Sequence, residues 1–120
     1  EFAVIKKGEH GVLIFNKDYV ISIPGYLTNY VKDPTGAGDS YAGAFFGYLD
    51  RIGNEYTFDN IFIASVLATV VASYTVQGFG SETLLNIGMN DIYERYEKYL
   101  NLIGQNSYMS LDNLKNKLDI

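Results

Sequence analysis

The segment from Thr35 to Asp39 combines two closely spaced glycines with a carboxylate. Two glycines separated by one residue let the backbone turn tightly and keep side-chain bulk away from an approaching ligand. If a helix begins here, its first turn has unpaired N–H donors and a partial positive charge, which suit a phosphate or a developing anion. The segment therefore predicts an anion cradle formed by the backbone of Gly36, Ala37 and Gly38.

The carboxylate of Asp39 needs a separate explanation, because it would repel a phosphate that the amides attract. It is explained if it accepts the proton of an acceptor hydroxyl while a phosphoryl group is transferred. A purely structural interpretation stays open, since acidic residues are favoured in the first turn of any helix and Asp33-Pro34 is an ordinary N-cap and N1 pair. A Gly-x-Gly pair alone is also a weak signal.

The elements that must position this segment begin with short β-rich runs separated by turn residues. Turns of this length join antiparallel neighbours. A further extended segment, about 27–31, leads into Asp33-Pro34, where the proline disfavours helix in the residue before it. The strands are expected at 2–5, 12–15 and 19–23, with turns at 8–11 and 16–18 and an end at Pro24-Gly25.

From Gly36 onward, apolar residues recur at helical spacing, in place of the short β-rich runs. The first helix should end near Gly53, bury Tyr41, Phe45 and Tyr48, and carry small residues on a neighbouring stripe, Gly36, Ser40, Gly43 and Gly47. Because glycines inside a helix cost stability, we expect a close neighbour on that stripe. Thr57 should cap a buried helix over 58–76. Further helices are expected over 90–103, with Glu94, Arg95, Glu97 and Lys98 in solvent, and over 111–118.

Composition restricts the partners. The chain has 120 residues, 48% of them hydrophobic, and a formal net charge of −5, which argues against binding to nucleic acid. The longest apolar stretch, 61–76, is shorter than the roughly 20 residues that span a bilayer. The chain has no cysteine, which is compatible with the cytoplasm, where we expect the protein. The single histidine, His10, is expected to be a solvated loop residue.

Three blocks of sequence resemble the ribokinase-like (PfkB) carbohydrate kinases. Residues 33–44, DPTGAGDSYAGA, resemble the second signature of that family, D-[TP]-T-G-A-G-D followed by a small-residue helix. Residues 6–12 resemble its strand-turn-strand element K-x-G-x-x-G, and residues 72–80 its helix end and loop that close the nucleotide pocket. The resemblance covers about residues 2–100 and is far more specific than an isolated glycine pair.

The resemblance implies an ATP-dependent, Mg²⁺-using kinase that phosphorylates a hydroxyl group of a sugar or nucleoside. By this resemblance Asp39 is the catalytic base, and Gly36, Ala37 and Gly38 supply the anion-hole amides. Asp33 and Thr35 match positions that help to hold a monovalent cation such as K⁺ in some members. The nucleotide would lie near the turn and the helix end, which gives Lys7, Gly8, Gly11, Gly38 and Gly78 as its expected neighbours.

The same resemblance implies a three-layer α/β/α fold of which residues 1–120 are the C-terminal portion. Members are considerably longer, and their N-x-x-E motif associated with magnesium does not occur here. We therefore expect half an active site, an inactive fragment, and a homodimer as the state of the full-length protein. Two alternatives stay open: a kinase of this fold for a vitamin-like alcohol or aminopyrimidine, and a nucleotide-binding module without activity.

Overall fold

The computed structural model describes residues 1–26, 36–77, 87–104 and 111–118. Its sheet has three antiparallel strands in the order β1-β2-β3, and each strand pairs with its neighbour in sequence. The three expected strands are confirmed to within a residue, whereas the extended segment expected at 27–31 lies outside the described residues. The strands are β1 (Ala3–Lys6), β2 (Val12–Phe15) and β3 (Val20–Ile23).

One face of this sheet is buried. Residues of neighbouring strands that stand opposite each other share a face; Val12 pairs with both Lys6 and Ile23, and Ile14 pairs with Ile21. The four valine and isoleucine residues on this face of β2 and β3 are each at most 3% exposed. The opposite face is more open, since Val20 is 67% exposed. The alternation of side chains along each strand thus directs the sheet onto the helices.

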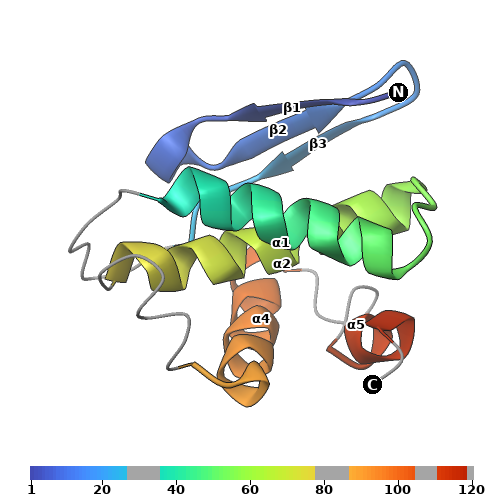
Figure 1. Cartoon of the computed structure of the whole chain (residues 1–120). Helices are drawn as coiled ribbons and strands as arrows, with labels where there is room; N and C mark the ends of the chain where they lie inside the picture. Colours follow the sequence, from blue (N-terminus) through green and yellow to red (C-terminus); the bar gives the residue numbers. More distant parts are fainter. Residues whose placement is uncertain (27–35, 78–86, 105–110, 119–120) are drawn as a thin grey trace.

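Helices α1 (Ala37–Arg51) and α2 (Phe58–Gln77) form the layer directly beneath the sheet (Figure 1). They pack along each other, and α1 buries the side chains of Tyr41, Phe45, Tyr48 and Leu49, as the helical spacing predicts. The Thr57 hydroxyl accepts a hydrogen bond from the backbone N–H of Asn60 at 3.2 Å, which confirms Thr57 as the cap of α2.

Helix α2 lies at the centre of the molecule. It contacts α1 on one side, β3 on another and α4 (Met89–Ile103) on a third, so that apolar side chains are useful nearly all round it. With 20 residues it is long and apolar enough to cross a membrane by length and composition, which corrects the expectation that the stretch is too short. Most of its length is buried inside this protein, and that burial accounts for its composition.

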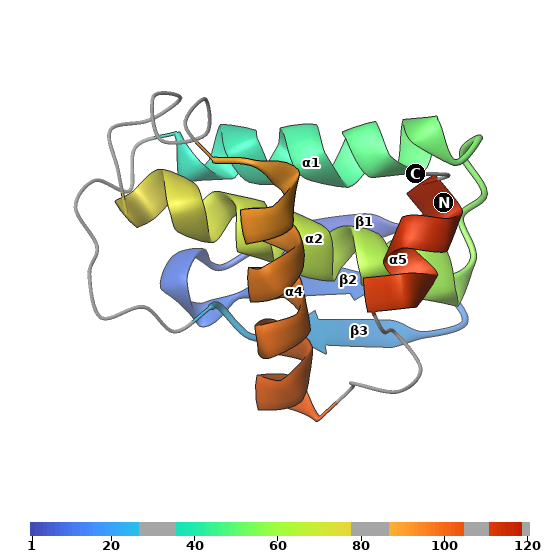
Figure 2. The same cartoon turned by 90° about the horizontal axis from the view of Figure 1, so that it is seen from below.

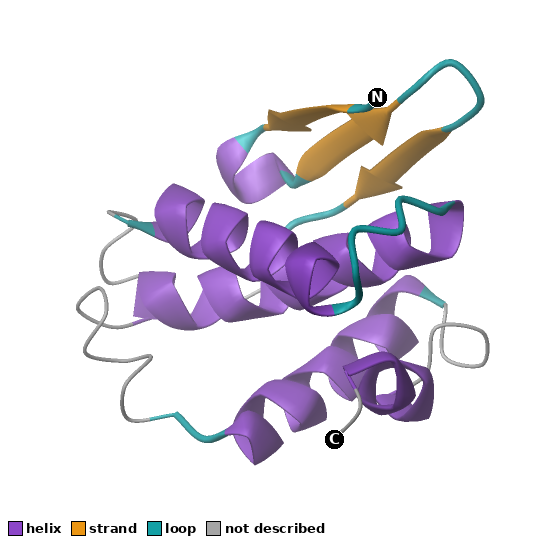
Figure 3. Cartoon of the chain, turned by 45° about the vertical axis from the view of Figure 1, so that its right-hand side comes forward, coloured by secondary structure: helices purple, strands orange, loops and turns teal. Residues whose placement is uncertain are grey.

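Helices α4 and α5 (Leu111–Leu118) lie below α2, on the side away from the sheet (Figure 2). Among the described residues every helix longer than one turn lies on the same side of the strands (Figure 3). The α/β class is thus confirmed, with one helix-covered sheet face and a second helical layer behind it. Helix α4 faces α2 with Tyr96, Tyr99 and Leu100, and it ends at Gly104, whose φ of 75° is accessible to glycine.

The small-residue stripe of α1 is not a packing surface in the described structure. Gly43 and Gly47 are exposed, and a Cβ atom added to either glycine would meet no described atom within 4 Å. The expectation of a close neighbour on that stripe is therefore wrong for these two positions. The stripe lies to one side of the face that packs against α2 and the sheet, and only its first part, at Ser40, contacts α2.

Candidate active site

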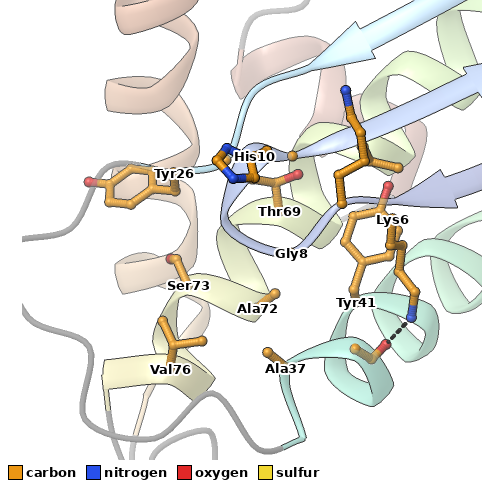
Figure 4. Close-up of a pocket in the computed structure, with 15 residues that line it drawn as sticks. Lys6, Gly8, His10, Tyr26, Ala37, Tyr41, Thr69, Ala72, Ser73 and Val76 are labelled. Atoms are coloured by element: carbon orange, nitrogen blue, oxygen red, sulfur yellow. Dashed lines mark hydrogen bonds between the residues drawn. The ribbon is translucent and has the colours of Figure 1, made fainter.

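A cleft of about 680 Å³ opens between the turn after β1, the start of α1 and one face of α2 (Figure 4). Its volume lies within the range typical of small-molecule sites. The lining includes five residues that the sequence predicts for the anion cradle or the nucleotide: Lys7, Gly8, Gly11, Ala37 and Gly38. Segments 30 residues apart in the sequence thus meet around one cavity.

The start of α1 presents backbone donors that the helix itself leaves unpaired. Gly36 precedes the helix in the left-handed conformation, with φ of 85°, and its carbonyl accepts the N–H of Ser40 at 2.9 Å. The amides of Ala37, Gly38 and Asp39 precede that first helical hydrogen bond and therefore have no partner within the helix. The N-cap position of α1 is Gly36, which corrects the alternative that Asp33 and Pro34 are its N-cap and N1 residues; those two residues themselves lie outside the described part of the chain.

Asp39 lies in the first turn of α1 with an exposed side chain. It does not line the cleft itself, but it directly follows Gly38, which does. The next residue, Ser40, accepts a hydrogen bond from the hydroxyl of Thr75 at 2.8 Å, which ties the start of α1 to the end of α2. The carboxylate is thus held beside the cleft by a fixed helix end, with room for a second molecule to approach it.

The turn between β1 and β2 is a short 3-10 helix, Gly8–His10. The N–H of Lys7 donates to the carbonyl of Gly11 at 2.7 Å. Both Gly8 and Gly11 have positive φ, which favours glycine at both positions. His10 is exposed, as expected, but it also lines the cleft, which the expectation of a purely solvated residue did not include.

Lys6 belongs to the site and was not among the predicted site residues. Its Nζ donates to the carbonyl oxygen of Gly38 at 3.1 Å, so a cation lies at the start of α1 (Figure 4). The alternation along β1 contains the signal: Lys6 follows Val4 by two residues, and residues two apart in a strand share a face. Lys6 also lies opposite the buried Val12, hence on the side of the helices.

Helix α2 supplies the opposite wall through Thr69, Ala72, Ser73 and Val76. Ala64 and Ala68 precede Ala72 by two turns and one turn on the same side of α2, but they are fully buried and do not line the cleft, so their small size serves core packing.

Arg95 corrects another expectation, since it is not part of a solvated helix face. Its side chain is partly buried, and its Nη1 donates to Ser73 Oγ at 2.9 Å and to Gln77 Oε1 at 2.7 Å. Glu94, Glu97 and Lys98 are exposed, as predicted. Helical spacing holds the missed signal: Arg95 stands three residues after Ile92 and four before Tyr99, on the inner side of α4.

One further titratable group lines the cleft. Tyr41 is 7% exposed, and burial raises the pKa of its phenol to about 12. The phenol therefore stays protonated at neutral pH and is unsuited to act as a base there. Asp39, which directly follows Gly38, is the carboxylate next to the anion cradle along the chain.

Three predicted site residues, Asp33, Thr35 and Gly78, lie outside the described residues. In the described parts of the chain, no group of three or more His, Cys, Asp or Glu side chains is close enough to hold a metal ion.

The antiparallel sheet, the glycine-rich helix start and the cleft agree with the comparison to known proteins. A family model described as "pfkB family carbohydrate kinase" matches residues 1–86. The chain belongs to this family of ribokinase-fold kinases.

The relatives are nucleoside and sugar kinases. A nucleoside kinase of Methanocaldococcus jannaschii is 33% identical over 96 residues, which is 80% of this chain and 30% of that protein. Its crystal structure superposes with a TM-score of 0.63, over 79% of this chain and 29% of that chain. The nucleoside kinase of Burkholderia thailandensis in complex with inosine gives a TM-score of 0.67 at 26% identity, over 82% of this chain and 30% of that chain.

A double mutant of fructokinase from Vibrio cholerae, solved with fructose, ADP and potassium ion, shares the fold. Its TM-score is 0.67 at 22% identity, over 78% of this chain and 29% of that chain. The present chain thus spans about 30% of the length of the relatives that it matches.

Proposed function

We propose that the full-length protein is an ATP-dependent kinase that transfers the γ-phosphoryl group to a hydroxyl group of a nucleoside or sugar. The observation that carries the proposal is the end of the cleft at Gly38, where free amides at the start of α1 and the Lys6 ammonium converge beside an exposed carboxylate. Family membership and the nucleoside kinase relatives support the same reaction.

In the proposed reaction the acceptor hydroxyl gives its proton to the carboxylate of Asp39. The hydroxyl oxygen forms the new bond to the γ-phosphorus, and the bond from that phosphorus to the β,γ-bridging oxygen breaks, so that ADP leaves. The amides of Gly36, Ala37 and Gly38 stabilise the charge on the transferred group, as oriented donors do in other enzymes. Lys7, Gly8 and Gly11 border the nucleotide from the opposite side.

The proposed reaction also uses two kinds of metal ion. Mg²⁺ neutralises the phosphate charges of ATP when it is bound. A monovalent cation such as K⁺ near Asp33 and Thr35 is part of the proposal, and the family resemblance of residues 33–39 supports it. A small-molecule acceptor and ATP are then the partners that the site itself requires.

A phosphorylation screen tests the proposed reaction. The purified full-length protein is incubated with ATP and Mg²⁺ and with nucleosides, pentoses, hexoses, a vitamin-like alcohol and a hydroxymethyl aminopyrimidine, each in turn. We expect ADP formation that depends on a nucleoside or sugar, with a phosphorylated product visible by mass spectrometry. Turnover only with the vitamin-like alcohol or the aminopyrimidine would establish the first alternative, and ATP binding without any turnover the non-catalytic module.

Lys6→Met tests the cationic end of the cleft. Because a hydrogen bond to a charged group contributes about 1.5–3 kcal/mol, we expect kcat/KM for ATP to fall by about one to two orders of magnitude. Steady-state kinetics of the full-length protein measure this, with Lys17→Met as the control, since Lys17 is exposed in the turn between β2 and β3. An unchanged kcat/KM for ATP in Lys6→Met would remove Lys6 from the site.

A further inference from the structure

We infer that Arg95 is a positioning residue at the end of the cleft where the base of the nucleotide would lie. It fixes the side chains at that end and makes the cleft favour a base whose exposed edge carries an amine. The inference rests on the proposed function, because it assumes that the cleft holds ATP. It goes beyond the family assignment, since Arg95 lies on α4, outside the residues 1–86 that match the family model.

Arg95 stands at the end of the cleft opposite the expected position of the phosphates. Figure 4 shows Lys6 and the Gly38 carbonyl at one end of the cleft and Tyr26, Ser73 and Val76 at the other. If the phosphates occupy the end with the cation and the free amides, the base lies toward Ser73. Arg95 does not line the cleft but stands directly behind that second end, where its Nη1 contacts Ser73 Oγ.

Aromatic rings and hydrogen bonds hold the Arg95 side chain firmly in place. Its guanidinium lies 3.6 Å from the ring centroid of Tyr74 and 5.0 Å from that of Tyr26. The Tyr74 hydroxyl donates to the carbonyl of Asp91, one turn before Arg95 on α4. A planar cation stacked on aromatic rings and hydrogen-bonded through its edge has one well-defined position. Tyr26 and Ser73, which line the cleft, are thus fixed to each other through Arg95.

The α2 wall of the cleft carries two hydroxyl groups, those of Thr69 and Ser73. The Ser73 hydroxyl donates its proton to the carbonyl of Val70 at 2.6 Å, and the Thr69 hydroxyl donates to the carbonyl of Ser65 at 2.8 Å. A carbonyl oxygen only accepts, so both hydroxyl protons are committed to the helix. Both residues line the cleft, so the capacity that these hydroxyls have left for a ligand there is that of an acceptor. Arg95 donates to the Ser73 oxygen and holds it in that arrangement.

An acceptor-bearing wall favours a ligand edge that donates. The exocyclic amine of adenine is such a donor, whereas the corresponding oxygen of a 6-keto purine would face the hydroxyl oxygens as another acceptor. Unpaired acceptors that face each other in a partly buried site are unfavourable. Loss of Arg95 frees the Ser73 side chain to turn and to donate, which should weaken the discrimination between ATP and inosine triphosphate.

Arg95→Met, Arg95→Lys and the control Arg51→Met, all in the full-length protein, test this inference. Arg51 is exposed at the end of α1 and does not line the cleft. We expect Arg95→Met to raise KM for ATP about ten-fold, with kcat changed by less than about two-fold and KM for the acceptor unchanged. The preference for ATP over inosine triphosphate should fall by a similar factor. Arg95→Lys should lie between, because it keeps the charge and loses the planar fork.

Two results would overturn the inference. One is an Arg95→Met protein with a lower melting temperature but an unchanged KM for ATP and an unchanged nucleotide preference, which would make Arg95 purely structural. The other, decisive if Arg95→Met does not fold, is a Ser73→Ala protein with the wild-type preference. Calorimetric titration with ATP and with inosine triphosphate gives the same comparison without turnover. A wild-type protein that binds both nucleotides but phosphorylates no acceptor would thus contradict the proposed function alone.

Discussion

Asp39→Asn in the full-length protein is expected to lower kcat by about three orders of magnitude, within the range that general base catalysis contributes. Asparagine has nearly the same shape and keeps the backbone N–H at the start of α1, but it cannot accept the proton of the acceptor hydroxyl. The affinity for ATP should change little, because the cleft is lined by Ala37 and Gly38 and not by the Asp39 side chain. Steady-state turnover and calorimetric ATP titration measure the two quantities.

Asp50→Asn is the matched control for this experiment. Asp50 lies on the same helix and is exposed, but it stands at the far end of α1, away from the cleft. The control should retain wild-type kcat. Near wild-type turnover of Asp39→Asn would show that another group accepts the proton, whereas a large loss of ATP affinity would show that Asp39 acts mainly in binding.

Gly11→Ala has the largest expected effect on stability, a loss of about 3 kcal/mol or more. Gly11 has φ of 95°, which alanine rarely adopts, and an added Cβ would lie 2.1 Å from the carbonyl oxygen of Ile23 and 2.8 Å from the nitrogen of Gly25. These neighbours are backbone atoms of the segment that ends β3, so the clash cannot be relieved by a side-chain rotation. Urea unfolding of the full-length protein at neutral pH measures the change.

Gly43→Ala provides the opposite case in the same measurement. Gly43 is exposed in the middle of α1, and an added Cβ would meet no described atom within 4 Å. Alanine should therefore stabilise the helix by up to about 1 kcal/mol. If Gly11→Ala unfolded at the wild-type urea concentration, the tight packing of the turn between β1 and β2 against the end of β3 would be refuted. Destabilisation by Gly43→Ala would mean that a neighbour covers that face in the full-length protein.

The strands and helices could be predicted from the sequence because each is marked by a local signal. The β-rich run Val12–Phe15 between two turns and the capping residue Thr57 are examples, and the structure confirms both. Burial of Tyr41 and Phe45 follows from helical spacing in the same way. The spacing of residues along the chain shows which face of its own helix or strand a residue occupies. For Tyr41 and Phe45 that face alone indicates that they are buried.

Lys6 and Arg95 show where this reasoning stops. Their positions in β1 and α4 place them on inward faces, but only the tertiary arrangement reveals that Gly38, 32 residues from Lys6, supplies the acceptor. The partners of Arg95 likewise come from another helix, 18 and 22 residues away. The expectation of a close neighbour at Gly43 is wrong for the converse reason. A stripe of small residues on a helix does not show whether another element covers it.

The central position of α2 has a consequence for how this part of the protein comes apart. Its middle is enclosed by the sheet, α1 and α4, and residues 63–70 are each at most 8% exposed. Amide hydrogens in such a segment exchange with solvent only when its surroundings open together, so α2 belongs to the most slowly exchanging unit. The face of α2 that carries Thr69 and Ser73 also walls the cleft. A form in which α2 has unfolded therefore lacks this wall of the proposed nucleotide site, and nucleotide bound there would protect the whole unit at once.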